Sequence, residues 1–402
     1  MYAFFTPQAV RDVLVEHADA FSLHDLGGPL AAFLGDGLLS LDGDVHKQHR
    51  RLLLPAFHRQ HLERYQTVMV QQTKALLDHW ENEERVNILR EMQRLTLRVA
   101  AATLFDVEIN EQSDALSKAF ATGLELGNLF WLCWNVPVLR WNLPITPYGR
   151  LSRAFATIDR TLSERIAERR ARAEDPGDTL SLLLASRDEQ GNGLSEKQVR
   201  DEAITLLFAG HETTANWLTW ALYLLASHSA VREKLLNELA TVLAGRSPSV
   251  EDLVHLPYLE MVLTETLRLY PPAWVLLRRA RKNVEIDGTP VAAGDLVWLS
   301  QWVMHRMPEY FPDPETFLPE RFDPRSGMKH PPLAFFRLSK IPLRNVQAPL
   351  QRTHRNAIQF PGISYGYHPS GRPVAAPIEV ELARSGRTVS GTWLGVHPRG
   401  SS

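Results

Sequence analysis

The sequence predicts a mainly α protein, a helical domain that carries a small β-rich subdomain. Its 402 residues, 44% hydrophobic and 22% charged, can bury a large core and have the composition of an ordinary globular chain. Apolar residues recur at helical spacing through most long stretches before residue 336. Short apolar runs bounded by turn residues cluster between residues 274 and 299, where we expect the sheet.

Composition also narrows the classes of function. The formal net charge of -2 gives no reason to expect a nucleic-acid partner. The single cysteine, Cys133, cannot form an internal disulfide, and no metal centre that needs two thiolates can be built from this chain. The first residues lack the charged end and long apolar stretch of a signal peptide, so we expect a cytoplasmic protein without a membrane span.

Capping residues and periodicity locate the helices. Thr6 followed by Pro7 predicts a helix start. Ser195 and Gln198 form a capping box, and the helix that follows extends to about Ser227, a length of roughly 45 Å. Further amphipathic helices are expected over residues 45–58, 61–80, 86–104 and 150–173.

The middle of the long helix is polar, with Glu212, Thr213 and Thr214 in succession. Burying a carboxyl and two hydroxyls is costly unless they meet partners, which indicates a functional site. In the alternative interpretation, the two hydroxyls only bond back to carbonyls one turn earlier and bend the helix. A zinc-protease helix is excluded, because its second histidine would fall at Ala215.

A second polar group is expected on a buried helix. Glu265 and Arg268 are three residues apart on a helix that Pro271 ends, so they can pair on one face. The apolar residues around them indicate a buried pair, which needs further donors, and Arg321 is the candidate third member.

The β-rich part is predicted from two short runs, residues 274–277 and 296–299, together with residues 284–286 and the Asp287–Gly288 turn. The stretch 305–324 alternates prolines with aromatic residues and is expected to be ordered coil.

These residues resemble the cytochromes P-450, the haem-thiolate monooxygenases, in their soluble bacterial type and over roughly residues 4–336. Residues 209–214 (AGHETT) are similar to the family's oxygen-activating helix motif. Glu265 and Arg268 are similar to its Glu-x-x-Arg pair, and Arg321 in the segment PERF to the arginine that completes the triad. The order and spacing of the three motifs also match. The resemblance implies the cytochrome P-450 fold, a haem cofactor and oxidoreductase activity.

The resemblance assigns roles to the polar centre of the long helix. Thr213 is expected to hold dioxygen by a hydrogen bond, and Glu212 to relay protons toward it. Ala209, Gly210 and Thr213 are expected to contact the cofactor, and Gly210 to keep side-chain bulk away from the oxygen pocket.

The resemblance also names partners for the haem propionates. Residues 44–51 are similar to the helix that lies over the haem edge, and His46 and Arg50 are four apart on one face of it. Arg278 is the expected third partner, with Arg279 as a weaker candidate. For His46, an ordinary surface histidine remains the alternative.

The family's axial ligand is missing. In the family a Phe-x-x-Gly-x-x-x-Cys-x-Gly loop supplies the thiolate, whereas no cysteine follows Cys133 here. Cys133 lacks the loop glycines, so we interpret it as a small buried side chain. Nothing around His354, His368 or His397 resembles a ligand loop. We therefore assign no metal ligand, and haem occupancy is an open question.

The chain is expected to divide into a cytochrome P-450-like domain, residues 1–336, and an atypical tail, residues 337–402. The tail holds eight Arg and one Lys against two Glu, with glycines and prolines that leave no long apolar period, so it is expected to fold poorly. Our hypothesis is that the tail is translated in a shifted reading frame. The residues after Phe336 permit codons that encode a Cys-x-Gly sequence when they are read in a frame shifted by two nucleotides. The family also has a strand and a helix before the position of Met1, so the chain is expected to be trimmed at both ends.

Two classes of function follow. The first is a monooxygenase that inserts one oxygen atom from O2 into an apolar small molecule, with electrons from a separate ferredoxin or flavodoxin. The second is an inactive remnant that binds haem or an apolar ligand weakly. The resemblance implies a monomer.

Overall fold

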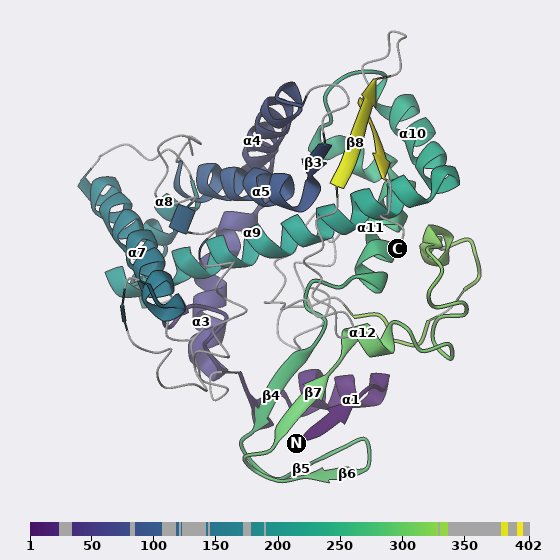
Figure 1. Cartoon of the computed structure of the whole chain (residues 1–402). Helices are drawn as coiled ribbons and strands as arrows, with labels where there is room; N and C mark the ends of the chain where they lie inside the picture. The colour runs from purple at the N-terminus through teal and green to yellow at the C-terminus, as the bar shows by residue number, and fades with distance from the viewer. Residues whose placement is uncertain are drawn as a thin grey trace. The chain divides into compact units, whose positions relative to one another are not determined.

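The computed structural model describes most of the chain before residue 336 and two short segments of the tail (Figure 1). The described residues are 1–23, 34–80, 85–106, 118–119, 122, 142–143, 145–171, 178–188, 190–328, 330–336, 379–384 and 392–396. They belong to two units: unit 1 comprises residues 1–21, 66–96 and 211–402, and unit 2 comprises residues 22–65 and 97–210.

Helices dominate the described residues, as the sequence predicts. They are α1 (Pro7–Arg11), α3 (Gly43–Leu53), α4 (Arg59–Asp78), α5 (Ile88–Phe105), α7 (Pro147–Ala171), α8 (Thr179–Ala185), α9 (Glu196–Ser227), α10 (Ser229–Leu243), α11 (Pro257–Leu269) and α12 (Gln301–Met304). Single turns of 3-10 or π helix are η1 (Asp12–Glu16), η2 (Ala18–Ala20), η4 (Leu54–Phe57), η6 (Val250–His255) and η7 (Pro319–Phe322). None of the helices in these described segments is long and apolar enough to cross a membrane.

The strands of the described residues form three small sheets. They are β1 (Tyr2–Phe4), β2 (Phe21–Ser22), β3 (Arg85–Asn87), β4 (Leu276–Ala280), β5 (Val284–Ile286), β6 (Thr289–Val291), β7 (Leu296–Leu299), β8 (Glu379–Arg384) and β9 (Thr392–Val396). The largest sheet has the order β1-β7-β4-β2, with β1 parallel to β7 and β4 antiparallel to it. A second sheet has the order β3-β8-β9, and β5 and β6 form a hairpin.

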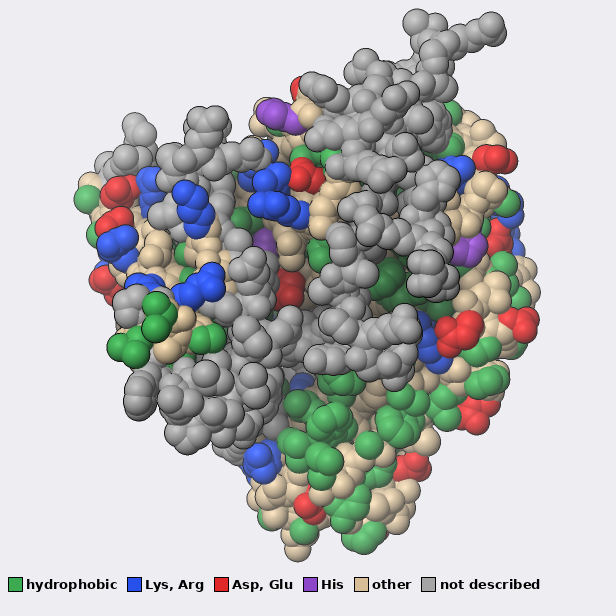
Figure 2. Space-filling model, viewed as in Figure 1, with side chains coloured by type: hydrophobic (Ala, Val, Ile, Leu, Met, Phe, Trp, Pro, Cys, Tyr) green, Lys and Arg blue, Asp and Glu red, His purple; other side chains and the backbone are tan. Residues whose placement is uncertain are grey.

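The core beneath the largest sheet joins the start of the chain to its last third. Side chains of α1 and η1 pack with those of β4 and β7 in one hydrophobic cluster, which includes Val10, Val13, Leu276, Val297, Leu299 and Phe336. Figure 2 shows hydrophobic side chains gathered over this part of unit 1. The cluster explains why the first residues of the chain are ordered.

The helix starts predicted from capping are confirmed. Thr6 caps α1, because its hydroxyl accepts a hydrogen bond from Ala9 N at 3.1 Å. At the start of α9, Gln198 N donates to Ser195 Oγ and Ser195 N donates to the Gln198 side chain, the two bonds of a capping box. The β5–β6 hairpin turns at Asp287 and Gly288, both with positive φ, as expected for an Asp-Gly turn.

Three details differ from the sequence predictions. The strand expected at residues 274–277 is β4, which starts at Leu276 and ends at Ala280. Residues 85–87 form β3 before α5 begins, because they pair with β8. In the tail, where no long apolar period predicted an element, β8 and β9 pair in an antiparallel ladder, and the poor folding of the tail stays a prediction.

Candidate functional site

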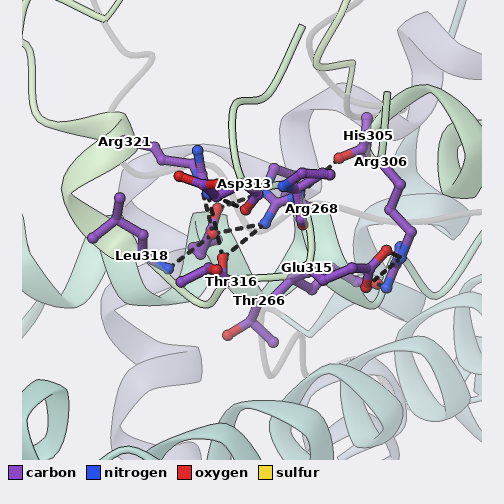
Figure 3. Close-up of polar contacts among 12 residues, drawn as sticks. Thr266, Arg268, His305, Arg306, Asp313, Glu315, Thr316, Leu318 and Arg321 are labelled. Atoms are coloured by element: carbon purple, nitrogen blue, oxygen red, sulfur yellow. Dashed lines mark hydrogen bonds and ion pairs between the residues drawn. The ribbon is translucent and has the colours of Figure 1, made fainter. Parts of the chain in front are cut away.

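A fully buried group of charged side chains lies in unit 1, between α11 and the segment that leads to η7. The Glu265 carboxylate accepts from Arg268 Nε at 2.7 Å and from Arg268 NH2 at 2.8 Å. Arg321 Nε donates to the same carboxylate at 3.3 Å. These three residues are at most 2% exposed, and with these bonds they form the predicted triad. Figure 3 labels Arg268 and Arg321 of this triad.

Backbone carbonyls complete the triad. Arg268 also donates to the carbonyls of His305 and Pro314, each at 2.7 Å. Arg321 donates to the carbonyl of Asp313 at 2.6 Å. Through these bonds the two guanidinium groups hold the coil at His305, Asp313 and Pro314 against α11.

The predicted catalytic pair lies in the middle of α9, in unit 1. Thr213 is buried and Glu212 is partly buried. Burial raises the pKa of Glu212 from 4.5 to about 7, because a carboxylate there loses contact with water. A carboxyl with this pKa can both give and take a proton at neutral pH.

The residue before this pair, His211, has a structural role. Its Nε2 donates to the carbonyl of Gln93 on α5 at 3.0 Å, and Thr96 donates to the carbonyl of His211 at 3.0 Å. Complete burial lowers the pKa of His211 to about 4, so the imidazole is neutral at pH 7. These bonds set the position of α9 one residue before Glu212.

The residues expected to bind haem propionates divide between the two units. His46 and Arg50 lie on α3, in unit 2 with Ala209 and Gly210, whereas Arg278 lies on β4 in unit 1. Burial lowers the pKa of Arg50, and its Nε is a buried donor with no hydrogen-bond partner among the described residues. A buried, unpaired guanidinium nitrogen is suited to an anion such as a propionate.

Among the described residues, no ligand for a haem iron can be assigned. The printed sequence has no cysteine after Cys133, and Cys133 lies outside the described residues, as do His354, His368 and His397. The described part of the chain contains no cluster of His, Cys, Asp or Glu suited to a metal ion. Partners for the edge of a haem and for its iron therefore stay predictions from the sequence.

The sequence reasoning missed two buried acidic residues near the start of α9, in unit 2. Glu202 pairs with His49 at 2.7 Å, and Asp201 pairs with Arg200 at 2.7 Å and with Lys197 at 2.8 Å. Two adjacent acids, Asp201 and Glu202, were a signal for such contacts, but their hydrogen-bond partners lie up to 165 residues away.

The chain combines a long helix that carries a central acid and alcohol with a buried Glu–Arg–Arg triad and a small sheet. This combination indicates a helical oxygenase fold. The family model described as Cytochrome P450 matches residues 1–336. The chain belongs to the cytochrome P450 family, whose members are haem-binding oxidoreductases.

Individual relatives agree with this family. The chain is 36% identical over 321 residues to cyclooctat-9-en-7-ol 5-monooxygenase from Streptomyces melanosporofaciens. This match covers 79% of this chain and 69% of the relative. It is 33% identical over 323 residues to pentalenene oxygenase from Streptomyces avermitilis, covering 79% and 70%. Retinoic acid-bound cyanobacterial CYP120A1 is similar in structure, with a TM-score of 0.73 and 31% identity over 83% of this chain and 74% of that one. The predicted family and fold are confirmed.

Proposed function

We propose that the chain is a haem-dependent monooxygenase that inserts one oxygen atom from O2 into an apolar small molecule. The observation that carries the proposal is the Glu212–Thr213 pair, a carboxyl with a pKa of about 7 beside a buried alcohol. In this family, haem supplies the iron at which dioxygen is reduced. Glu212 passes protons toward the hydroxyl of Thr213, and the hydroxyl positions the oxygen by a hydrogen bond.

The substrate and the electron donor follow from the same proposal. The names of two relatives state oxidation of cyclooctat-9-en-7-ol and of pentalenene, and we infer an apolar compound of comparable size for this chain. We propose that the electrons come from a separate ferredoxin or flavodoxin type of donor, as expected for the soluble bacterial type of the family that the chain resembles.

A second candidate is an inactive cytochrome P450 remnant that binds haem or an apolar ligand weakly. The absence of any cysteine after Cys133 favours it. We propose that residues 337–402 are read out of frame, which is supported by the end of the family match at residue 336. Sequencing the gene tests this, because codons that cannot encode a Cys-x-Gly sequence in the shifted frame contradict it.

The difference spectrum of the reduced protein with carbon monoxide separates the two functions. The full chain is expressed with a haem precursor, reduced and exposed to carbon monoxide. A strongly red-shifted Soret band shows thiolate ligation and supports the monooxygenase. Bound haem without that shift supports the inactive remnant for the printed polypeptide.

A further inference from the structure

A buried histidine–carboxylate pair in unit 2 connects α3 to the first turns of α9. His49 Nδ1 lies 2.7 Å from Glu202 Oε1, and the two residues are 2% and 0% exposed. The second oxygen of Glu202 accepts from Leu38 N at 3.2 Å. Both oxygens of this carboxylate are therefore hydrogen-bonded, as a buried charge requires.

The direction of the hydrogen bonds follows from the capping box. Ser195 N donates to the side-chain oxygen of Gln198 at 2.9 Å, so the amide nitrogen of Gln198 points the other way. This nitrogen lies 3.2 Å from His49 Nε2. An amide nitrogen only donates, so Nε2 accepts, and the imidazole carries its proton on Nδ1 and donates it to Glu202.

The same bond sets the rotation of α3 about its axis. At 100° per residue, His46 and Arg50 lie about 60° and 100° around the helix from His49, on one side of it. Leu52 and Leu53 are buried on either side of the His49 direction. A turn of α3 about its axis would break the contact with Glu202 and redirect His46 and Arg50 together.

The anchor on α9 is itself held. Asp201 accepts from Asp36 N at 2.9 Å, which ties residues 34–40 to the same helical turn as Glu202. The segment lies so close to α9 that a Cβ on Gly37 would be 2.0 Å from Thr205 Oγ1. Glu202 therefore cannot follow a movement of α3 without displacing this segment.

We infer that His49 and Glu202 are positioning residues that direct His46 and Arg50 toward the carboxylates of a bound haem. The inference rests on the proposed haem-dependent function and on the expectation that the helix over residues 44–51 lies over the haem edge. Arg50 supports it, because its buried Nε has no partner among the described residues and so points to an anion as its missing partner.

The test compares two porphyrins that differ only in the charge of their edge. Haemin carries two propionates, and haemin dimethyl ester carries none. We expect the full chain to bind haemin roughly tenfold or more tightly than the ester, because charge-assisted hydrogen bonds are made only with haemin. Dissociation constants are measured by absorbance titration of the wild type, His49→Leu and His49→Asn.

The two variants are a matched pair. Asn places an amide donor close to the position of Nδ1, so His49→Asn is expected to keep the preference for haemin within about twofold. Leu removes the donor at similar volume, so His49→Leu is expected to bind haemin and its ester about equally. If His49→Leu does not fold, His49→Gln, which has no donor at the Nδ1 position, takes its place.

The ratio of the two dissociation constants in each variant tests whether His49 and Glu202 position the propionate partners. A lost preference in His49→Leu with a retained preference in His49→Asn supports the inference. If His49→Leu weakens both porphyrins by the same factor, the pair only stabilises the fold and the inference is wrong, while the proposed function stands. A wild type that binds both equally also overturns the inference, and a wild type that binds neither overturns the proposed function and the inference with it.

Discussion

Substitution of Glu265 by glutamine tests the energetic weight of the buried triad. In the native chain the carboxylate accepts from two nitrogens of Arg268, from Arg321 and from Leu318 N at 3.0 Å. Glutamine has the same shape but one oxygen, and its amide hydrogens would face guanidinium hydrogens. Two buried guanidinium groups would then lack a counter-charge.

The expected loss is large because both charges remain buried. Removing one partner of a buried ion pair costs about 3–5 kcal/mol, and we expect Glu265→Gln to lower the free energy of unfolding by that amount. Glu168→Gln is the matched control: Glu168 pairs with Arg165 at the same three-residue spacing, but the side chains are 48% and 42% exposed. That exposed pair should contribute less than about 0.5 kcal/mol.

Urea unfolding of the full chain, followed by far-ultraviolet circular dichroism, measures both variants. The shift in midpoint at a common slope gives the change in free energy. A loss below about 1 kcal/mol for Glu265→Gln would refute the reasoning, since it would mean that water or the backbone carbonyls already neutralise both guanidinium groups.

Three further predictions concern titration and packing. Glu212→Gln should raise stability by about 3 kcal/mol at pH 8 and leave it nearly unchanged at pH 4. The pKa of Glu212 is about 7 in the folded chain and 4.5 in the unfolded chain, so the native carboxyl binds more protons than the unfolded one. The stability of the wild type therefore falls as the pH rises from 4.5 to 7. Urea unfolding of both proteins at pH 4 and pH 8 checks this. His305 is buried with a pKa lowered to about 3, and neither ring nitrogen has a partner among the described residues, so the wild type should lose stability as pH falls from 6.5 toward 3. His305→Phe should weaken that pH dependence, and an unchanged pH profile would contradict the assignment. Gly37→Ala should lower the free energy of unfolding by about 1–3 kcal/mol, because the added Cβ would meet Thr205 Oγ1. In thermal unfolding, the double variant with Thr205→Ala should recover part of this loss. No recovery would show that the clash lies elsewhere.

Local signals account for the parts of the structure that the sequence predicted well. The bounds of α9 follow from the Ser195 capping box, and the Glu265–Arg268 pair follows from helical spacing next to Pro271. Each depends on residues within one or two turns of each other, which is the range that periodicity and capping describe.

The contacts that were missed are distant in sequence. A strand of three residues such as β1 has no stability alone, and it exists because β7 pairs with it. His49 was passed over because its partner, Glu202, is 153 residues away. The sequence next to His49 and next to Glu202 is that of an ordinary surface histidine and an ordinary helix carboxylate. Only the folded chain shows that the two residues are buried together.

The pairing of β1 with β7 has a consequence for synthesis on the ribosome. Tyr2 is made about 295 residues before its ladder partner Val297. At 5–20 residues per second the nascent strand waits roughly 15–60 s for its neighbour. During that interval its free edge and the apolar side chains of α1 are open to chaperones and to other chains, so the yield of folded protein should depend on how they are shielded.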